Sequence, residues 1–418
     1  MNAVALRTEK RNGKVYIEDT KEEPLLSQKP DKIFGFMLEP YEKTIKVVWD
    51  VRGFVKPVLD LLPDDVAKKL VQGDRIEFDG FRIWLGQTRH GNILGVSYKE
   101  YKRIRGNIHE RNVYDQDIFE LKQYFPGEPE PQNLYGIKEK GDYILTVLEK
   151  MGLNPKRLTS AAAIYQECVL DKMPIPTIWN MPEESYPMME MCANYVREWH
   201  GDYESKNWDK EQTFKCDVSA AYPSALAEMP NLKYAKYISL EECKGKYYWA
   251  ILKGDLNITS LLSTVVDEQG KNLFGEYKDA VISSDDWDCL KRWKLGEFTP
   301  ETGWVLVLDK DVKLFGYIMR RLYDYRGGNP VRDALSKSMA VSVIGKFMEM
   351  HGEEFGDYFN GIYASMVTSK VRAKVCDFIH RNKLQDDVME VTVDGLKSKK
   401  FVGLPQIRKF GEWRIIDN

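Results

Sequence analysis

The stretch Asp217-Val218-Ser219-Ala220-Ala221-Tyr222-Pro223-Ser224 joins two different hydrophobic patterns. Residues 214–218 form a β-like run that ends near Asp217, and residues 225–229 form a helical run. A sharp turn with Pro and Ser at the helix start places unpaired backbone N–H groups and the positive helix end beside Asp217. The stretch therefore predicts a strand end that suits a phosphate and a metal ion. The alternative is that Asp217 only forms a turn or cap.

A second acidic residue ends another β-like run, Glu390-Val391-Thr392-Val393-Asp394-Gly395-Leu396. In an extended strand Thr392 and Asp394 share one face, and the valines share the other. An ordinary Asp-Gly hairpin explains this pattern equally well. If Asp217 and Asp394 meet at strand ends, they can hold two divalent cations, which activate a hydroxyl and stabilise a leaving group in phosphoryl transfer.

Between these runs, residues 320–347 predict two helices joined by Gly327-Gly328-Asn329-Pro330. In the second helix Lys337, Val341, Ile344 and Gly345 fall on one face. Such a face with one lysine is usually a core face whose lysine reaches solvent.

Taken in order, the three stretches resemble motifs of family B DNA polymerases. The first resembles Asp-x-x-Ser-Leu-Tyr-Pro-Ser, the second Lys-x-x-x-Asn-Ser-x-Tyr-Gly, and the third Tyr-x-Asp-Thr-Asp-Ser. The matching positions are Asp217, Tyr222, Pro223, Ser224, Lys337, Ser342, Gly345 and Asp394. Lys346-Phe347 continues the second motif as in the protein-primed viral and plasmid branch.

Several positions depart from the family pattern. Ala220 and Ala221 stand for Ser-Leu, and Val341 and Ile344 stand for Asn and Tyr. Thr392 stands where the family has its first aspartate in the third motif. The replacements at Val341 and Ile344 put in doubt how the nascent base pair is checked.

The resemblance implies roles for individual residues. Asp217 and Asp394 would be catalytic and, with Val218, would hold two Mg²⁺ ions, with Mn²⁺ as a possible substitute. The ring of Tyr222 would lie under the incoming sugar and exclude a 2′-hydroxyl. The implied nucleotide-binding residues are Val218, Ala221, Tyr222, Arg326, Lys337 and Val341.

The resemblance covers about residues 142–413 and implies an α+β, multidomain "right hand". Its expected parts are a degenerate exonuclease-like (RNase H-like) α/β domain at 1–150, a helical connecting region at 151–212, palm at 213–305 and 341–418, and fingers at 306–340. Relatives continue into a thumb, so the end at Asn418 predicts that the thumb is absent. A partner subunit is then expected to supply the thumb or processivity.

The N-terminal region predicts β-structure at Val15–Ile17, Lys32–Leu38, Thr44–Trp49 and Arg75–Leu85. Asp79-Gly80 within the last run is a type I′ hairpin signal. The basic, aromatic stretch at residues 98–105 is either a solvated helix face or loop, or a contact to nucleic-acid backbone. Pro174-Ile175-Pro176 is the expected domain joint.

An active exonuclease would need paired carboxylates, and no convincing Asp-x-Glu strand is present. Glu18, Asp19, Asp79 and Asp142 are the candidate acids. We expect a degenerate domain that serves as a scaffold or template-strand surface.

Composition limits the surface charge, the state of the cysteines and the presence of membrane spans. The chain has 418 residues and a net charge of −3, which allows a local cationic channel but no uniformly basic surface. Its six cysteines are widely spaced, which favours reduced thiols in the cytoplasm, the host cytoplasm if the protein is viral or plasmid-encoded. No stretch approaches the roughly 18 apolar residues of a membrane span.

The sequence thus predicts a template-directed DNA polymerase that acts on primer-template DNA and dNTPs, either alone or as one subunit of a split enzyme. The alternative is a catalytically silent relative that binds nucleic acid as a replication accessory protein. A primase-like enzyme is disfavoured by Tyr222. The catalytic hypothesis requires that Asp217 and Asp394 converge, and that neither is held by a permanent cationic neighbour.

Overall fold

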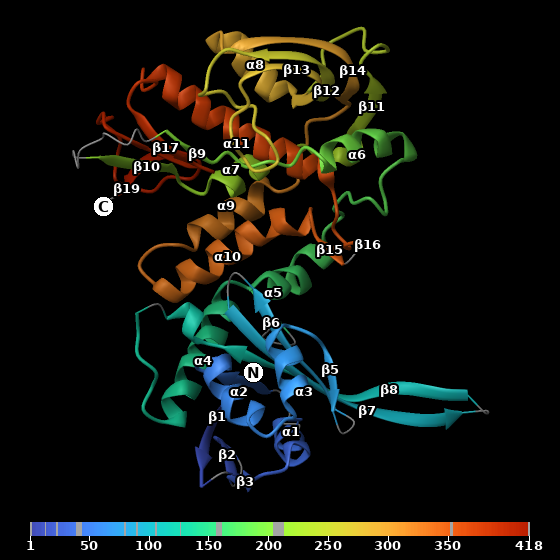
Figure 1. The fold of residues 1–418 in the computed structure, drawn as a ribbon, viewed down its shortest axis with the longest axis vertical. Coiled ribbons are helices and arrows are strands. Elements are labelled where there is room, and N and C mark those ends of the chain that lie inside the picture. The colour runs from blue at the N-terminus through green and yellow to red at the C-terminus, as the bar shows by residue number, and fades with distance from the viewer. Residues whose placement is uncertain are drawn as a thin grey trace. The chain divides into compact units, whose positions relative to one another are not determined.

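The computed structural model describes residues 2–12, 14–21, 24–38, 44–78, 81–88, 91–104, 107–125, 127–155, 161–203, 213–351 and 354–416. The chain forms two compact units. One contains Met1–Met173 and Tyr325–Met339, and the other contains Pro174–Asp324 and Ala340–Asn418. The boundary at Pro174 coincides with the start of the predicted proline-bounded joint. Figure 1 shows the chain coloured from its N-terminus to its C-terminus.

The first unit contains an eight-stranded mixed sheet in the order β3-β2-β1-β4-β8-β7-β6-β5. Strands β1, β4 and β8 are parallel neighbours, and all other neighbours are antiparallel. The strands are β1 (Asn2–Arg11), β2 (Lys14–Asp19), β3 (Leu25–Ser27), β4 (Thr44–Val48), β5 (Ile76–Phe78), β6 (Phe81–Thr88), β7 (Gly91–Ile104) and β8 (Asn107–Glu120).

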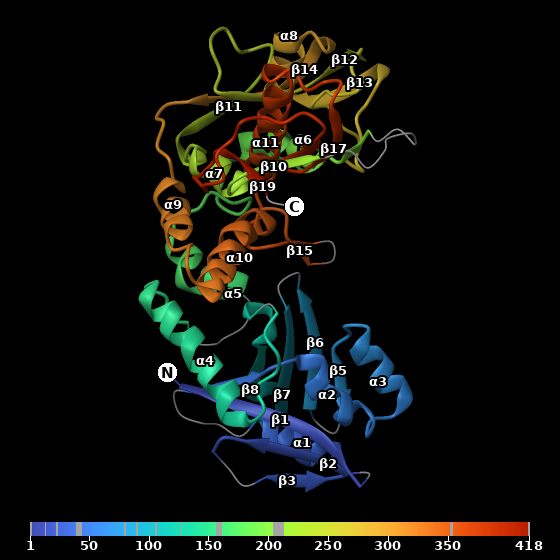
Figure 2. The same cartoon turned by 90° about the vertical axis from the view of Figure 1, so that its left-hand side faces the viewer.

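Helices cover both faces of this sheet, as an α/β domain requires (Figure 2). They are α1 (Pro30–Leu38), α2 (Val51–Leu59), α3 (Asp64–Val71) and α4 (Leu134–Lys150). Helix α5 (Ala161–Cys168) and the 3₁₀ turns at Lys122–Tyr124 and Leu170–Lys172 are the other helical segments. Gly141 of α4 packs against Ala3 and Val47. The next residue of β4, Val48, points to the other face and joins one buried core with α1 and α2.

Two N-terminal predictions were wrong in element type. Residues 32–38 were expected as a strand and form α1, because a short buried apolar run has no periodicity that separates the two. Residues 98–104 belong to β7 rather than to a helix or loop, and only their backbone is described. Phe78 pairs with Phe81 as the predicted hairpin requires, while Asp79 and Gly80 lie outside the described residues.

The second unit contains a five-stranded sheet in the order β19-β10-β18-β17-β9 and a four-stranded sheet in the order β11-β14-β12-β13. A short pair, β15 with β16, completes it. The strands are β9 (Gly201–Asp202), β10 (Phe214–Val218), β11 (Ala235–Ser239), β12 (Trp249–Ile258), β13 (Gly275–Ser283), β14 (Gly296–Leu308), β15 (Met350–His351), β16 (Glu354–Phe355), β17 (Val388–Thr392), β18 (Gly395–Ser398) and β19 (Trp413–Ile416).

The helices of the second unit are α6 (Tyr186–Ala193), α7 (Ala221–Ala227), α8 (Ser284–Trp293), α9 (Gly316–Asp324) and α11 (Gly361–Arg381), with 3₁₀ turns at Glu183–Ser185 and Leu232–Tyr234. Helix α10 (Pro330–Lys346) begins in the first unit and ends in the second. Helices α9 and α10 are the two predicted helices joined through Gly327–Asn329, with Pro330 as the first residue of α10. No helix among the described residues has the length and apolar character needed to cross a membrane.

Helix α11 lies over one face of the five-stranded sheet (Figure 1). Phe378 of α11 stacks on Trp413 of β19, with ring centroids 3.9 Å apart. Trp413 pairs with Val218 across the sheet, so both side chains point toward α11. Because side chains alternate along a strand, their neighbours Asp217 and Arg414 point to the opposite face. The packing of α11 therefore decides which face of the sheet carries Asp217.

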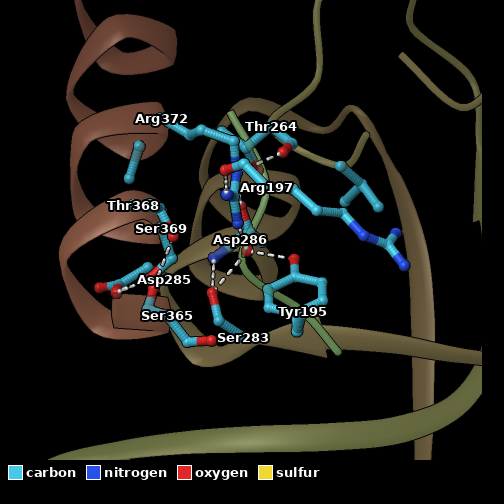
Figure 3. A network of polar contacts seen from close by, with 12 residues as sticks. Tyr195, Arg197, Thr264, Ser283, Asp285, Asp286, Ser365, Thr368, Ser369 and Arg372 are labelled. Atoms are coloured by element: carbon cyan, nitrogen blue, oxygen red, sulfur yellow. Dashed lines mark hydrogen bonds and ion pairs between the residues drawn. The ribbon is translucent and has the colours of Figure 1, made fainter. Parts of the chain in front are cut away.

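A buried ion pair connects α11 to α8 (Figure 3). The guanidinium of Arg372 is 2.9 Å from the carboxylate of Asp286, and both side chains are almost fully buried. Tyr195 and Ser283 each donate a hydroxyl hydrogen bond of 2.5 Å to Asp286. Arg372 also donates to the carbonyl of Thr264, at 3.0 Å. Each charge is thus paired and further hydrogen-bonded, which is the condition for burying it.

We expect Arg372→Met to lower the free energy of unfolding by about 3–5 kcal/mol, because it leaves the Asp286 carboxylate buried without its cation. Urea unfolding followed by circular dichroism measures this. Lys236→Ala, which removes an exposed ion pair with Asp309, is the control and should cost less than about 1 kcal/mol. Equal losses in the two variants would contradict the structural role of the buried pair.

Candidate functional site

Strand β10 is paired on both edges, and this pairing brings the two predicted aspartates together. Asp217 lies opposite Gly395 of β18 and opposite Arg414 of β19. The backbone N–H of Val218 donates to the carbonyl of Asp394, at 2.9 Å. Asp217 and Asp394, far apart in sequence, are therefore neighbours at one end of the five-stranded sheet.

Asp394 lies in a turn rather than in a strand. Thr392, the last residue of β17, pairs with Gly395, the first of β18, so Val393 and Asp394 form a two-residue connection. The prediction of an extended strand through Asp394, with Thr392 and Asp394 on one face, is therefore wrong. A hairpin does form here, but its two turn residues are Val393 and Asp394, and Gly395 already belongs to β18, so the Asp-Gly turn of the alternative interpretation does not form.

A row of four residues crosses the sheet on the face of Asp217: Arg414, Asp217, Gly395 and Thr392. Gly395 lets the strands approach closely. A Cβ at this position would lie 2.6 Å from the carbonyl oxygen of Cys216 and 3.3 Å from both the Asp217 Cβ and the Thr392 Oγ1. The position between Asp217 and Thr392 therefore requires a residue without a side chain.

Arg414 binds both oxygens of the Asp217 carboxylate. Its Nε is 2.8 Å from Oδ1, and one terminal nitrogen is 3.1 Å from Oδ2. The pair is partly buried, with side-chain exposures of 18% for Arg414 and 23% for Asp217. Such a bidentate pair is among the stronger polar contacts in proteins. The requirement that neither aspartate has a cationic neighbour is thus not met at Asp217.

The turn after β10 is held by the segment before β19. The N–H of Ser219 donates to Glu412, and the N–H of Gly411 donates to Ser219, at 2.9 and 2.8 Å. The N–H of Ser224 donates to Ala220, so not all of the predicted N–H groups at this turn are free. Ala220 has φ of 55°, in the left-handed region that alanine rarely adopts. Backbone strain therefore lies between Asp217 and α7.

Tyr222, in the first turn of α7, faces two carboxylates. Its hydroxyl donates to Oε1 of Glu198, at 2.7 Å. Burial raises the pKa of Tyr222, the negative charges of Glu198 and Asp394 raise it further, and Arg372 opposes them. The phenol therefore stays protonated and acts as a donor. Glu198 could not be predicted from the sequence, because a single acid in an irregular segment carries no pattern.

The other predicted site residues are positioned by their own elements. Val218 and Ala221 are buried, and Val341 is half-buried on α10. Lys337 is exposed on α10, whose buried side carries Leu335, Met339 and Val343. The face containing Lys337 is therefore not a core face. Arg326 and Lys337 belong to the first compact unit, and their part in the site stays a prediction.

The candidate exonuclease acids hold local structure. Asp142 accepts a hydrogen bond from the N–H of Ala3, at 2.6 Å, and pairs with Lys138. Glu18 accepts from Tyr16, at 3.0 Å, and Asp19 accepts from the N–H of Lys21, at 2.7 Å. Asp79 lies outside the described residues. Each of the three described acids thus has a hydrogen-bond partner in the protein, and Asp142 joins α4 to β1.

Oxygen atoms of the kind that Mg²⁺ prefers are present at the end of β10. They are the carboxylates of Asp217 and Asp394 and the carbonyl of Val218. The buried Oγ of Ser219 has no hydrogen-bond partner among the described residues, so a bound polar group would complete its bonding. No three His, Cys, Asp or Glu side chains of the described residues are grouped closely enough to hold a metal ion. The donor chemistry fits Mg²⁺, and Arg414 is the obstacle.

Comparison with known proteins identifies the fold. No protein-family model and no curated protein matches the chain. The structure is similar to Phi29 DNA polymerase in its ternary complex with primer-template DNA and incoming nucleotides, with TM-score 0.63 and 13% identity, over 99% of this chain and 83% of that one. The structure is also similar to the complex of Phi29 DNA polymerase with single-stranded DNA, with TM-score 0.60 and 12% identity, over 99% of this chain and 83% of that one.

At this identity the likeness shows the fold alone. The predicted class, a mixed α+β multidomain polymerase fold, is confirmed. The five-stranded sheet with Asp217 and Asp394 is the part of this fold that the sequence motifs predicted.

We expect Gly395→Ala to destabilise the protein by about 1–3 kcal/mol, because the added methyl group forces β10 and β18 apart. Gly403→Ala is the matched control, since a Cβ there meets no atom within 4 Å. Urea unfolding measures both variants. A Gly395→Ala protein as stable as the control would show that the close approach of the strands is not required.

Proposed function

We propose that this chain is a template-directed DNA polymerase that transfers a deoxynucleotidyl group to a primer 3′-hydroxyl with the help of Mg²⁺. The observation that carries the proposal is the placement of Asp217 and Asp394 at neighbouring strand ends of a polymerase fold. Primer-template DNA and dNTPs are the proposed partners, because the similar Phi29 structure holds primer-template DNA and incoming nucleotides.

Asp217, Asp394 and the carbonyl of Val218 would hold the metal ions. When bound, Mg²⁺ lowers the pKa of a hydroxyl and stabilises charge on a transferring phosphoryl group. Tyr222 would form the wall beside the incoming sugar, where a 2′-hydroxyl would collide with its ring. Lys337 and Arg326 would neutralise the triphosphate.

Arg414 sets a condition on this activity. Both oxygens of Asp217 accept a hydrogen bond from its guanidinium, so a metal ion at Asp217 would either displace Arg414 or share the carboxylate with it against charge repulsion. Arg414 is at the sheet edge, in the last strand, and its side chain is partly exposed. Movement of this side chain to solvent leaves β10 paired on both edges and is therefore compatible with the fold.

The same ion pair favours a second function. If Arg414 holds Asp217 permanently, the chain is a catalytically silent polymerase relative that binds nucleic acid in a replication complex. Thr392, in place of a carboxylate, also weakens metal binding under this alternative. The two functions differ in one property, the exchange of Arg414 for a divalent cation.

Primer extension with Mg²⁺ or Mn²⁺ separates the two functions. We expect the wild-type protein to incorporate dNTPs, and Asp217→Ala and Asp394→Ala to lower the rate by at least about a thousandfold, because each removes an oxygen ligand of the ions that stabilise the transition state. Asp255→Ala, an exposed acid on β12, is the control. Incorporation that survives both active-site substitutions would exclude the mechanism. No incorporation by wild type or by Arg414→Gln would favour the silent relative.

Arg414→Gln also tests the ion pair without catalysis. Removal of the guanidinium frees Asp217, so we expect Mn²⁺ to bind about tenfold more tightly, corresponding to about 1.4 kcal/mol. Isothermal titration calorimetry with MnCl₂ measures the affinity. Arg408→Gln is the control for the loss of one positive charge nearby in sequence. Unchanged affinity in Arg414→Gln would show that the pair does not compete with metal.

A further inference from the structure

Glu198 is a carboxylate of the site that neither the sequence motifs nor the predicted metal ligands include. It lies in the segment between α6 and β9. Its Oε1 accepts the hydroxyl hydrogen of Tyr222, at 2.7 Å, while its side chain remains 46% exposed. The second oxygen is 3.6 Å from Nε2 of His200. Glu198 therefore accepts a hydrogen bond from Tyr222 while its own side chain stays partly exposed to solvent.

The backbone is fixed on both sides of Glu198. Before it, the carbonyl of Arg197 accepts a hydrogen bond from the guanidinium of Arg372, and the Arg197 side chain donates to the carbonyl of Val266, at 2.7 Å. After it, the buried indole of Trp199 donates to Asn272, at 3.0 Å. The contacts of Arg197 and Trp199 therefore fix the main chain on both sides of Glu198, and with it the position of Glu198.

Gly270 completes this support. The N–H of His200 donates to the carbonyl of Gly270, at 2.8 Å. A Cβ on Gly270 would lie 2.4 Å from the carbonyl oxygen of Glu198, and its φ of 79° also favours glycine. The loop that contains Gly270 therefore packs directly against the main chain of Glu198.

The buried ion pair of Arg372 and Asp286 lies behind this segment. Figure 3 shows Arg372 between Asp286 and the backbone of Arg197, with a dashed line to each. The nearly complete burial of the pair makes it a rigid base. A half-exposed carboxylate on such a base matches the arrangement of functional groups that are held in place by a supporting layer.

The hydrogen bond to Glu198 fixes the ring of Tyr222 at its far end. The Cα of Tyr222 is held by α7, and the hydroxyl is held by a charged acceptor, which makes the bond stronger than one between neutral groups. With both ends held, the ring cannot swing about its side-chain torsions. Without Glu198, the hydroxyl end would lose this charged acceptor.

We propose that Glu198 is the positioning residue for Tyr222, and that it thereby sets the selection of deoxyribonucleotides over ribonucleotides. This inference rests on the proposed polymerase function. A ring held by Glu198 resists displacement by a 2′-hydroxyl, whereas a ring free to rotate yields to it. The carboxylate acts through Tyr222 and has no part in phosphoryl transfer.

The test is single-nucleotide primer extension with each dNTP and its matching rNTP, from which the ratio of the two kcat/KM values is obtained. Glu198→Ala and Tyr222→Phe each remove the hydrogen bond, and each should lower the ratio by about tenfold, the discrimination that one small group in a binding wall supplies. The double variant should show no further loss. Glu198→Gln keeps an acceptor oxygen and should retain most of the ratio.

Glu190→Gln, an exposed acid on α6, is the control and should leave the ratio unchanged. Equal losses of dNTP and rNTP use in Glu198→Ala would indicate a structural role and overturn the inference, as would additive losses in the double variant. Wild-type incorporation with an unchanged ratio in Glu198→Ala would reject this inference alone. Failure of wild type to incorporate any nucleotide would reject the proposed function, and the inference with it.

Discussion

The pairing of β10 on both edges is the constraint on which the site depends. It fixes which residues lie beside Asp217: Gly395 on one strand and Arg414 on the other. The packing of α11 on Val218 and Trp413 then decides that this row points away from the helix. A slip of one residue in either pairing would turn Asp217 toward α11 and bury a carboxylate in an apolar contact. The register of three strands therefore determines whether an acidic site exists at all.

The cation at Asp217 is supplied by the chain itself. An arginine and a divalent ion are attracted to the same carboxylate, and they compete for it because Arg414 occupies a hydrogen-bonding site on each oxygen. Whether Arg414 or the divalent ion binds depends on the interaction free energy of each with Asp217 and with the nearby Asp394. A metal that binds both aspartates gains from two negative charges. The strand geometry thus places Arg414 and a divalent cation in competition for Asp217. The free energy of exchanging one for the other decides between an enzyme and a silent relative.

Sequence reasoning predicted the parts of this structure that are local. The end of β10, the helix pair α9 and α10, and the hairpin that pairs Phe78 with Phe81 follow from residue patterns within short windows. Arg414 and Glu198 could not be predicted, because their contacts depend on strand register and on a loop packed from distant segments. The helix at Pro30–Leu38 was mistaken for a strand because a buried apolar run has no distinguishing period. The roles of Arg326, Lys337 and Val341 stay predictions.

The most direct test of the central claim is a crystal structure of the protein with MnCl₂, with an anomalous difference map collected at the manganese edge. The account predicts an anomalous peak in contact with Asp217 and Asp394, with the guanidinium of Arg414 moved away from Asp217. A map without a peak at these carboxylates, in which Arg414 still binds both oxygens of Asp217, would contradict it.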